Sequence, residues 1–340
     1  MLRENIHFST SLAVPPLPFE LDHASKILLM GSCFAENMGQ FLQSYKFCVE
    51  QNPFGILYNP FSVSQSLKRL MNPIPFTETD LICSQSVYHS WEHHSRFSGM
   101  SPEECLDGIN KQLVRTAAFF EKTDTILITW GTAFVYFLKE NNRIVANCHK
   151  QAESLFVRRR LDVEEIVEEW VSCMGEILGR NPHIRFIFTV SPIRHWKDGA
   201  HGNQLSKSIL LLAIDKLCTH FPKNTAYFPS YEIMMDELRD YRFYAEDMLH
   251  PSQLAIRYIW KRFQEAAFSA KTIRLMESVE QIQKALNHKP FHPKSASHYR
   301  FLEQTLQKID TVSSTAGIDF YEEKKRLLQL LDANIKNKEN

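Results

Sequence analysis

The chain has 340 residues, of which 44% are hydrophobic and 23% charged, and its 39 lysines and arginines balance its 39 aspartates and glutamates. This composition is typical of a globular protein with a large apolar core. Because the net charge is zero, the molecule as a whole does not attract nucleic acid or an anionic membrane, and we expect neither as a partner.

The first 18 residues contain no apolar core of the length of a signal peptide. No stretch of the sequence approaches the ~20 apolar residues that cross a bilayer. The seven cysteines are scattered without a CxxC pair, in a chain too long to depend on disulfide bonds. We therefore predict reduced thiols and a cytoplasmic protein.

Short apolar runs alternate with longer amphipathic segments over the first 270 residues. The predicted strands are residues 26–30, 47–50, 125–129, 184–190 and 226–228. The predicted helices between them are residues 35–44, 60–71, 102–121, 163–179 and 204–220. Strands that alternate with amphipathic helices favour right-handed crossovers and a mostly parallel sheet covered on both faces. The expected fold class is therefore α/β, as a three-layer α/β/α sandwich.

Two stretches interrupt this alternation. Residues 72–100 are too long for a plain connection. Residues 134–150 are typical of a hairpin whose turn lies at Asn141 and Asn142. Long insertions near the ends of parallel strands often shape a binding site, and we expect these two to do so.

After about residue 270, apolar residues recur only at helical spacing. They form three stripes: Leu275, Val279, Ile282 and Leu286; Leu302, Leu306 and Ile309; and Tyr321, Leu328 and Leu331. We predict two domains, an α/β domain over residues 1–270 that carries both insertions and a helical extension over residues 271–340. The extension is expected to pack on the first domain or on another protomer, which makes it the expected contact of any homo-oligomer.

The segment KILLMGSCFAENMG (residues 26–39) joins the end of a strand to the start of a helix. Gly31 permits a tight turn, and Ser32 then stands at the carboxyl end of a parallel strand, where open α/β sheets place their sites. The free N–H groups and the dipole of the helix can stabilise a developing oxyanion there. Serine is also a favoured N-cap residue, so this segment by itself fits either a nucleophile or a cap.

A second segment, DYRFYAEDMLHPS (residues 240–252), places Asp247 and His250 three apart near the end of the α/β region. A serine hydroxyl needs a base to take its proton, and the imidazole needs a carboxylate to hold its tautomer. Together the two segments predict a triad of Ser32, Asp247 and His250. Cys33 adjoins Ser32, but adjacent residues that leave a strand point in different directions. We therefore expect Ser32 as the nucleophile and Cys33 beneath the turn.

The sequence GSCFA at residues 31–35 resembles the signature of the GSCFA-domain family within the SGNH/GDSL hydrolase superfamily. Further segments resemble the family in the same order: NPFGILYNP (52–60), TWGTAFVY (129–136), NCHK (147–150), SPIRHWKDG (191–199) and EDMLHPS (246–252). They spread over about residues 20–260. The resemblance implies a flavodoxin-like α/β/α fold and ester or acyl chemistry. It also implies that Ser32 is the nucleophile and that Asp247 and His250 are its partners.

The resemblance further implies an oxyanion hole with three donors. They are the N–H of the serine, the N–H of a glycine after the second strand, and an asparagine side chain after the third. Ser32 and Gly55 match the first two. Residues 129–136 contain no asparagine, so the expected third donor is either Thr132 or Asn147.

Several side chains near predicted strand ends are candidates for the substrate cleft. His149, Lys150, Arg194 and His195 could bind a carboxylate or phosphate on the substrate, and for each the alternative is an exposed position without a role. An acyl or sugar pocket could be walled by aromatic residues, although core packing is the alternative for each ring. These are Trp91, Phe97, Phe134, Tyr136 and Phe137.

Histidines and cysteines can bind zinc, and the sequence offers His89, His93, His94, Cys148, His149 and His195. Their spacing matches no recognised ligand pattern, so we expect no metal and no cofactor. We predict a serine-dependent ester hydrolase or O-acyltransferase that forms an acyl-enzyme on Ser32, with His250 as general base and Asp247 orienting it. The expected substrate is a small-molecule or glycan ester, and the resemblance implies a small acyl group on a carbohydrate. The alternatives are a metal-dependent hydrolase and a noncatalytic binding protein on a hydrolase scaffold.

Overall fold

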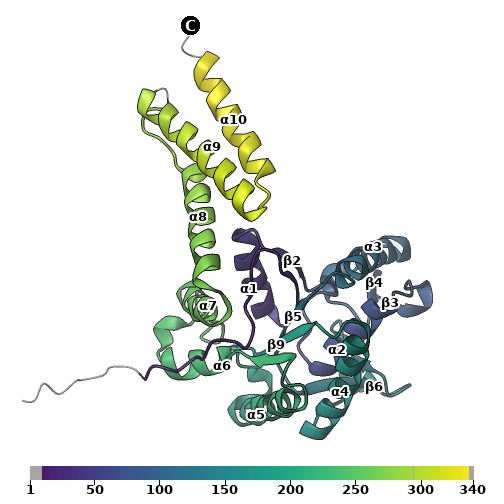
Figure 1. Cartoon of the computed structure of the whole chain (residues 1–340). Coiled ribbons are helices and arrows are strands. Elements are labelled where there is room, and N and C mark those ends of the chain that lie inside the picture. Colours follow the sequence, from purple (N-terminus) through teal and green to yellow (C-terminus); the bar gives the residue numbers. More distant parts are fainter. Residues whose placement is uncertain (1–9, 294, 337–340) are drawn as a thin grey trace, which may run out of the picture.

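A five-stranded parallel sheet forms the centre of the computed structural model, which describes residues 10–293 and 295–336 (Figure 1). Residues 1–9 of the segment considered for a signal peptide lie outside the described residues. The strands are β1 (Lys26–Gly31), β2 (Cys48–Gln51), β5 (Thr125–Trp130), β9 (Arg185–Val190) and β10 (Thr225–Tyr227), in the order β10-β9-β5-β1-β2. All neighbours pair in parallel. The order reverses between β1 and β5, and such a switch point is where open α/β sheets bind ligands.

Helices cover both faces of this sheet, because successive strand residues point to opposite sides. Leu28 and Met30 of β1 join one apolar core with α2 (Pro60–Met71), α3 (Pro102–Phe120), α4 (Val163–Arg180) and α5 (Gly199–His220). Ile27 and Leu29 join the other core with α1 (Cys33–Ser44) and α7 (Gln253–Ala267). The predicted three-layer α/β/α sandwich is confirmed. All five predicted strands form, and α5 begins earlier than predicted.

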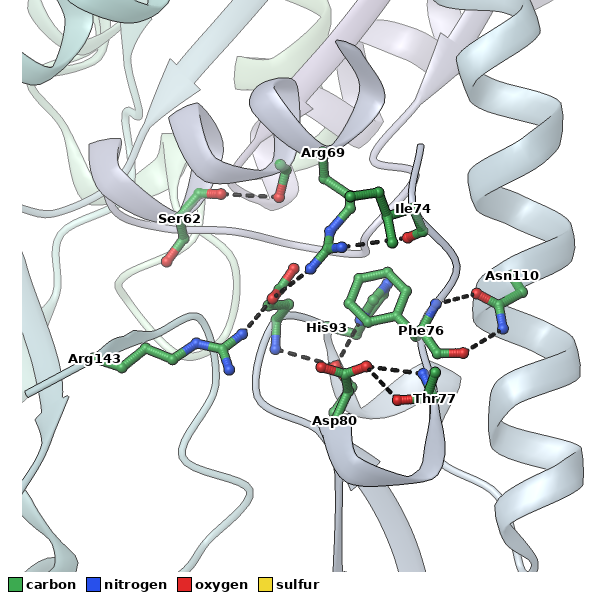
Figure 2. Close-up of polar contacts among 12 residues, drawn as sticks. Ser62, Arg69, Ile74, Phe76, Thr77, Asp80, His93, Asn110 and Arg143 are labelled. Carbon is green, nitrogen blue, oxygen red and sulfur yellow. Dashed lines mark hydrogen bonds and ion pairs between the residues drawn. The ribbon is translucent and has the colours of Figure 1, made fainter. Parts of the chain in front are cut away.

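The insertion at residues 72–100 contains a hairpin of β3 (Leu81–Ser84) and β4 (Val87–Ser90). Figure 2 shows how polar contacts fix it to its neighbours. The backbone N–H of Phe76 donates to Asn110 of α3 at 2.8 Å, and the Asn110 amide donates back at 2.9 Å. Glu92 pairs with both Arg69 of α2 and Arg143 of the second insertion. These contacts fix the insertion against α2, α3 and the second insertion.

The insertion at residues 134–150 forms the predicted hairpin, with β6 (Phe134–Leu138) antiparallel to β7 (Ile144–Val145). Asn142 has a φ of 57°, in the left-handed region that asparagine tolerates in such turns. A third strand, β8 (Phe156–Arg160), pairs with the other edge of β6 and was not predicted.

Three helices end the chain and extend away from the sheet in Figure 1: α8 (Ala270–Asn287), α9 (Ala296–Ala316) and α10 (Tyr321–Lys336). They share their own apolar core, and Met276 of α8 also packs in the core of α1 and α7. The first two predicted stripes contribute to this core, but the third was wrong in part. Tyr321 is 67% exposed and Leu328 42% exposed, whereas Phe320 and Leu327 are buried. No helix in the described part of the chain has the length and apolar character needed to cross a bilayer.

Candidate active site

Ser32 lies at the junction of β1 and α1. Gly31 before it has a φ of 130°, and a Cβ at this position would lie 2.0 Å from the carbonyl oxygen of Thr129, so the turn requires glycine. Ser32 is the N-cap of α1, and its Oγ accepts a hydrogen bond from the N–H of Phe34 at 3.3 Å. The capping role is therefore present, and a catalytic role must rest on what else surrounds the hydroxyl.

Asp247 and His250 form a compact pair in the loop before α7. His250 Nδ1 lies 2.5 Å from one carboxylate oxygen of Asp247, and the other oxygen accepts the N–H groups of His250 at 2.9 Å and Leu249 at 3.0 Å. The two backbone bonds and then the ring lower the pKa of Asp247 to about 2. Because an ionised carboxylate only accepts, Nδ1 carries the proton and Nε2 of the neutral ring is left as an acceptor.

Ser32 and His250 line one cavity of about 300 Å³, which we call the serine cavity. Its other lining residues are Cys33, Tyr58, Ser191, Ile193, Arg194, His195, Trp196, Lys197 and Leu249. They come from segments after β1, β2 and β9 and from the loop before α7, at the carboxyl edge of the sheet. In the described conformation no hydrogen bond joins Ser32 Oγ to His250. Catalytic hydrogen bonds of unliganded enzymes often form only when the substrate binds.

The two backbone donors expected for an oxyanion hole already have acceptors. The N–H of Ser32 donates to the carbonyl of Thr129 at 3.0 Å, as part of the pairing between β1 and β5. The N–H of Gly55 donates to the carbonyl of Asn52 at 2.8 Å within a turn. Neither group can bind an oxyanion unless these bonds open.

The two candidates for the third donor lie away from the serine cavity. Thr132 Oγ1 is 3.1 Å from Ser206 Oγ and accepts the N–H of Phe134. The Asn147 amide donates to Ser95 Oγ at 3.1 Å, and its oxygen accepts the N–H of His149 at 2.9 Å. Neither residue lines the cavity, because each is used to fold its own loop.

His195 lines the serine cavity, and one of its ring nitrogens has no partner among the described residues. Within the described residues, His195 Nε2 is buried and has no hydrogen bond. It lies 3.0 Å from where a Cβ on Gly131 would be, at the end of β5. Burial lowers the pKa of His195 to about 4, and the nearby Lys207 lowers it further. The ring is therefore neutral near pH 7 and carries one N–H.

A buried lysine that was not predicted supports this part of the site. Lys207 of α5 is 0% exposed, and its ammonium group donates to the carbonyls of Gly131 and Ser191, both at 2.8 Å. These carbonyls follow β5 and β9. Burial lowers the pKa of Lys207 to about 7, and its contacts in the described chain include no carboxylate. The sequence held one signal, since Lys207 lies on the same predicted helical face as Leu210 and Ile214.

Cys33 also lines the serine cavity, so the expectation that it lies beneath the turn was wrong. Helix α1 begins at Cys33, and the first turn of a helix can present two consecutive residues at the strand edge. Burial, and then the charge of Glu36, raise the pKa of the Cys33 thiol. The thiolate that would make cysteine a strong nucleophile is therefore disfavoured.

His149 does not reach the serine cavity, contrary to prediction. Its Nε2 lies 2.8 Å from the carbonyl of Ser90, and its ring stacks on His89 at 4.5 Å. Burial lowers the pKa of His149 to about 4. It therefore helps to join the two insertions. Lys150, which follows it, also does not line the cavity.

The other histidines and aromatic rings of the insertions are packing residues. The ring of His93 contacts the rings of Phe54 and Phe76, and its Nδ1 lies 2.9 Å from Ser90 Oγ. Figure 2 shows His93 next to Phe76. Across residues 10–293 and 295–336, no three side chains of His, Cys, Asp or Glu are grouped to hold a metal ion. The five aromatic residues expected around a pocket, Trp91, Phe97, Phe134, Tyr136 and Phe137, do not line the serine cavity. The insertions therefore do not shape this cavity.

The sequence model of the GSCFA family matches residues 26–263, and that of the GSCFA domain protein, C-terminal domain, matches residues 279–333. Among curated proteins none matches. Similar solved structures include an acetyl xylan esterase from the rumen bacterium Butyrivibrio proteoclasticus, at 11% identity and a TM-score of 0.37, covering 75% of this chain and 64% of that one. A family 3 carbohydrate esterase from Clostridium thermocellum has 9% identity and a TM-score of 0.35, covering 75% and 98%. Likenesses at this level carry no information on activity.

Proposed function

The chain belongs to the GSCFA family, and we propose that it is a serine-dependent ester hydrolase or O-acyltransferase that forms an acyl-enzyme on Ser32. The observation that carries the proposal is the serine cavity, where Ser32 and a histidine already oriented by a carboxylate lie together. A hydroxyl, a base with a free ring nitrogen and an ionised carboxylate are the three groups that this chemistry needs.

In the proposed reaction, His250 Nε2 takes the proton of Ser32 as Oγ attacks the ester carbonyl. The tetrahedral intermediate collapses, the bond to the alcohol oxygen breaks, and His250 protonates the departing alcohol. Water or an acceptor alcohol then loses its proton to His250 and attacks the acyl-enzyme, and the proton returns to Ser32. Asp247 holds the ring and stabilises the imidazolium in both steps. The second nucleophile decides between hydrolysis and transfer.

To react, the Ser32 hydroxyl must give up its capping hydrogen bond to α1. Its Oγ accepts from Phe34 N–H in the described conformation, and turning the side chain toward His250 gives up a bond worth about 1 kcal/mol. This amount is small beside the barriers that enzymes lower. The cap and the nucleophile are therefore compatible roles of one hydroxyl, used in turn.

His195 is our candidate for the oxyanion donor, in place of Thr132 and Asn147. Its ring is neutral and its buried Nε2 lacks a partner among the described residues. An N–H at this nitrogen can donate to a developing oxyanion without first breaking another bond. The N–H of Ser32 would join it only if its present bond opened on substrate binding, and Gly55 does not line the serine cavity.

Labelling with a fluorophosphonate probe tests the proposal. The native chain and Cys33→Ala should be labelled, whereas Ser32→Ala and His250→Ala should not. Cys33→Ala is the matched control because Cys33 lines the same cavity next to Ser32. A folded native chain that is not labelled would refute a reactive triad.

A noncatalytic binding protein on a hydrolase scaffold is the second candidate. It is favoured by the missing hydrogen bond between Ser32 and His250 and by the two occupied backbone donors. Under this alternative the chain should resist the probe while ligands still bind in the serine cavity. Protection of Cys33 from alkylation by a bound ligand would detect such binding.

A further inference from the structure

A second cavity opens beside the serine cavity. It has a volume of about 490 Å³ and shares Arg194, Trp196 and Leu249 with its neighbour. We call it the side cavity. Asp247, Met248 and Leu249, from the loop that carries His250, form part of its wall. In the proposed function, His250 protonates the departing alcohol, so the alcohol portion of the ester belongs on this side.

The charged residues of the side cavity are paired, with one exception. Arg239 pairs with Asp236 at 2.7 Å, Asp240 with Arg242 at 3.4 Å, and Asp247 with His250. Arg194 has neither a hydrogen bond nor a carboxylate partner in the described part of the chain, and its Nε is buried. A buried N–H donor without a partner costs free energy, and a bound anion would remove this cost for Arg194.

The surroundings of Arg194 also favour an anion. Its guanidinium lies over the ring of Trp196 at 5.1 Å, which orients it at the boundary of the two cavities. Lys207, whose side chain donates to the carbonyls of Gly131 and Ser191 beside the serine cavity, is a second basic group without a carboxylate partner among the described residues. The remaining wall of the side cavity is largely apolar and aromatic, with Met235, Tyr241 and Tyr244. Aromatic walls suit a flat ring, whether of a sugar or an aryl group.

We propose that the side cavity binds the alcohol portion of the ester, and that this portion carries a ring and an anionic group held by Arg194. The anionic group is a carboxylate or a phosphate, both of which match the fork of a guanidinium. This inference rests on the proposed function for the direction in which the ester lies. The anion site itself depends only on Arg194 and its surroundings.

Three acetate esters with one acyl group test the substrate preference. They are the acetates of 4-hydroxybenzoate, 4-hydroxyphenyl phosphate and 4-hydroxybenzamide, which differ in the carboxylate, phosphate or neutral amide on the ring. After correction for their rates with hydroxide, kcat/KM should be at least about 10-fold higher for one or both anionic esters. The comparison between them distinguishes carboxylate from phosphate. Equal rates for all three would overturn the inference and leave the proposed function standing.

Variants of Arg194 test whether this side chain is the source of the preference for anionic esters. Arg194→Gln should bring the ratio of anionic to neutral kcat/KM close to 1, and Arg194→Lys should keep part of it because the charge remains. Arg257→Gln is the matched control, since it removes an exposed arginine of α7 that lines neither cavity. A preference that survives in Arg194→Gln would contradict the assignment.

Binding separates this inference from the proposed function. Ser32→Ala is titrated by calorimetry with 4-hydroxybenzoate, 4-hydroxyphenyl phosphate and 4-hydroxybenzamide. If the native chain neither hydrolyses the esters nor reacts with fluorophosphonate, the proposed function fails. Tighter binding of an anion that is lost with Arg194→Gln would still support the anion site. Equal or absent binding of all three compounds would then overturn it.

Discussion

Replacing Lys207 with methionine removes a buried positive charge and should flatten the dependence of stability on pH between pH 7 and pH 9. Burial lowers the pKa of Lys207 from 10.5 to about 7. Between these values the unfolded chain binds a proton that the folded chain does not. Raising the pH therefore stabilises the native folded state relative to the unfolded chain, and the methionine variant lacks this contribution.

The size of the effect follows from the pKa difference. From 10.5 to about 7 is roughly 3.5 pH units, which at 1.36 kcal/mol per unit is roughly 5 kcal/mol over the full range. Between pH 7 and pH 9, folded Lys207 goes from half-protonated to neutral while the unfolded lysine stays charged. The free energy of unfolding of the native chain should therefore rise by roughly 2 kcal/mol relative to the variant. Methionine also leaves the carbonyls of Gly131 and Ser191 without a donor, at about 1–3 kcal/mol each, but this loss is the same at both pH values.

Urea unfolding of both chains at pH 7 and pH 9 measures the difference. Lys216→Met is the matched control, because Lys216 is an exposed lysine of the same helix that pairs with Glu164. It should follow the native chain at both pH values. Equal changes in the native chain and Lys207→Met would refute the reasoning, since Lys207 would then be charged in the folded state throughout.

Three further predictions concern the site itself. Asp247→Asn should lower kcat about 10⁴-fold through the wrong tautomer of the triad histidine; an ester hydrolase assay measures this, and an unchanged kcat would remove Asp247 from the mechanism. His195→Ala should lower kcat about 100-fold or more by removing an oxyanion donor, whereas Thr132→Ala should leave kcat unchanged; the reverse pattern would restore Thr132 as the donor. Gly31→Ala should destabilise the fold by several kcal/mol in thermal unfolding, because its Cβ would meet the Thr129 carbonyl oxygen at 2.0 Å. A soluble variant with native stability would show that the turn relaxes easily.

The sheet and the main site segments could be predicted because they depend on local patterns. The apolar runs of β1, β5 and β9 are buried on both faces and bounded by helical segments, which is typical of a parallel sheet. The order of Ser32 in the sequence, directly after the first strand, placed it at the carboxyl edge. The turn from Asp247 to His250 is short enough that spacing alone suggested their contact, which the structure contains at 2.5 Å.

The oxyanion donors and the residues of the cleft depend on the direction in which individual side chains and N–H groups point, and local sequence patterns do not encode that direction. The N–H of Ser32 was expected to bind an oxyanion. It donates instead to the carbonyl of Thr129, because the pairing of β1 with β5 continues to Gly31 opposite Thr129 and the next N–H completes it. Asn147 and His149 follow a strand end as a binding residue would, yet their nitrogens go to Ser95 and Ser90. The packing of the two insertions against each other, which is a long-range contact, determines these hydrogen-bond partners. Arg194 and His195 were expected in the cleft and do line the serine cavity.

Lys207 links the stability of the fold to the chemistry proposed for it. A lysine that holds the ends of β5 and β9 together could be replaced by an uncharged donor if its only role were to satisfy two carbonyls. Instead, no carboxylate among the described residues pairs with it, and burial disfavours its charged form, which lowers its pKa to about 7. In the proposed reaction, a negative charge would form in the neighbouring serine cavity, and Lys207 would stabilise it. Arg194 is a second basic side chain without a carboxylate partner among the described residues, and its anion would belong to the bound substrate. A molecule with a net charge of zero thus places two basic side chains without a carboxylate partner among the described residues, Lys207 and Arg194, beside the cavities where we propose that the ester binds.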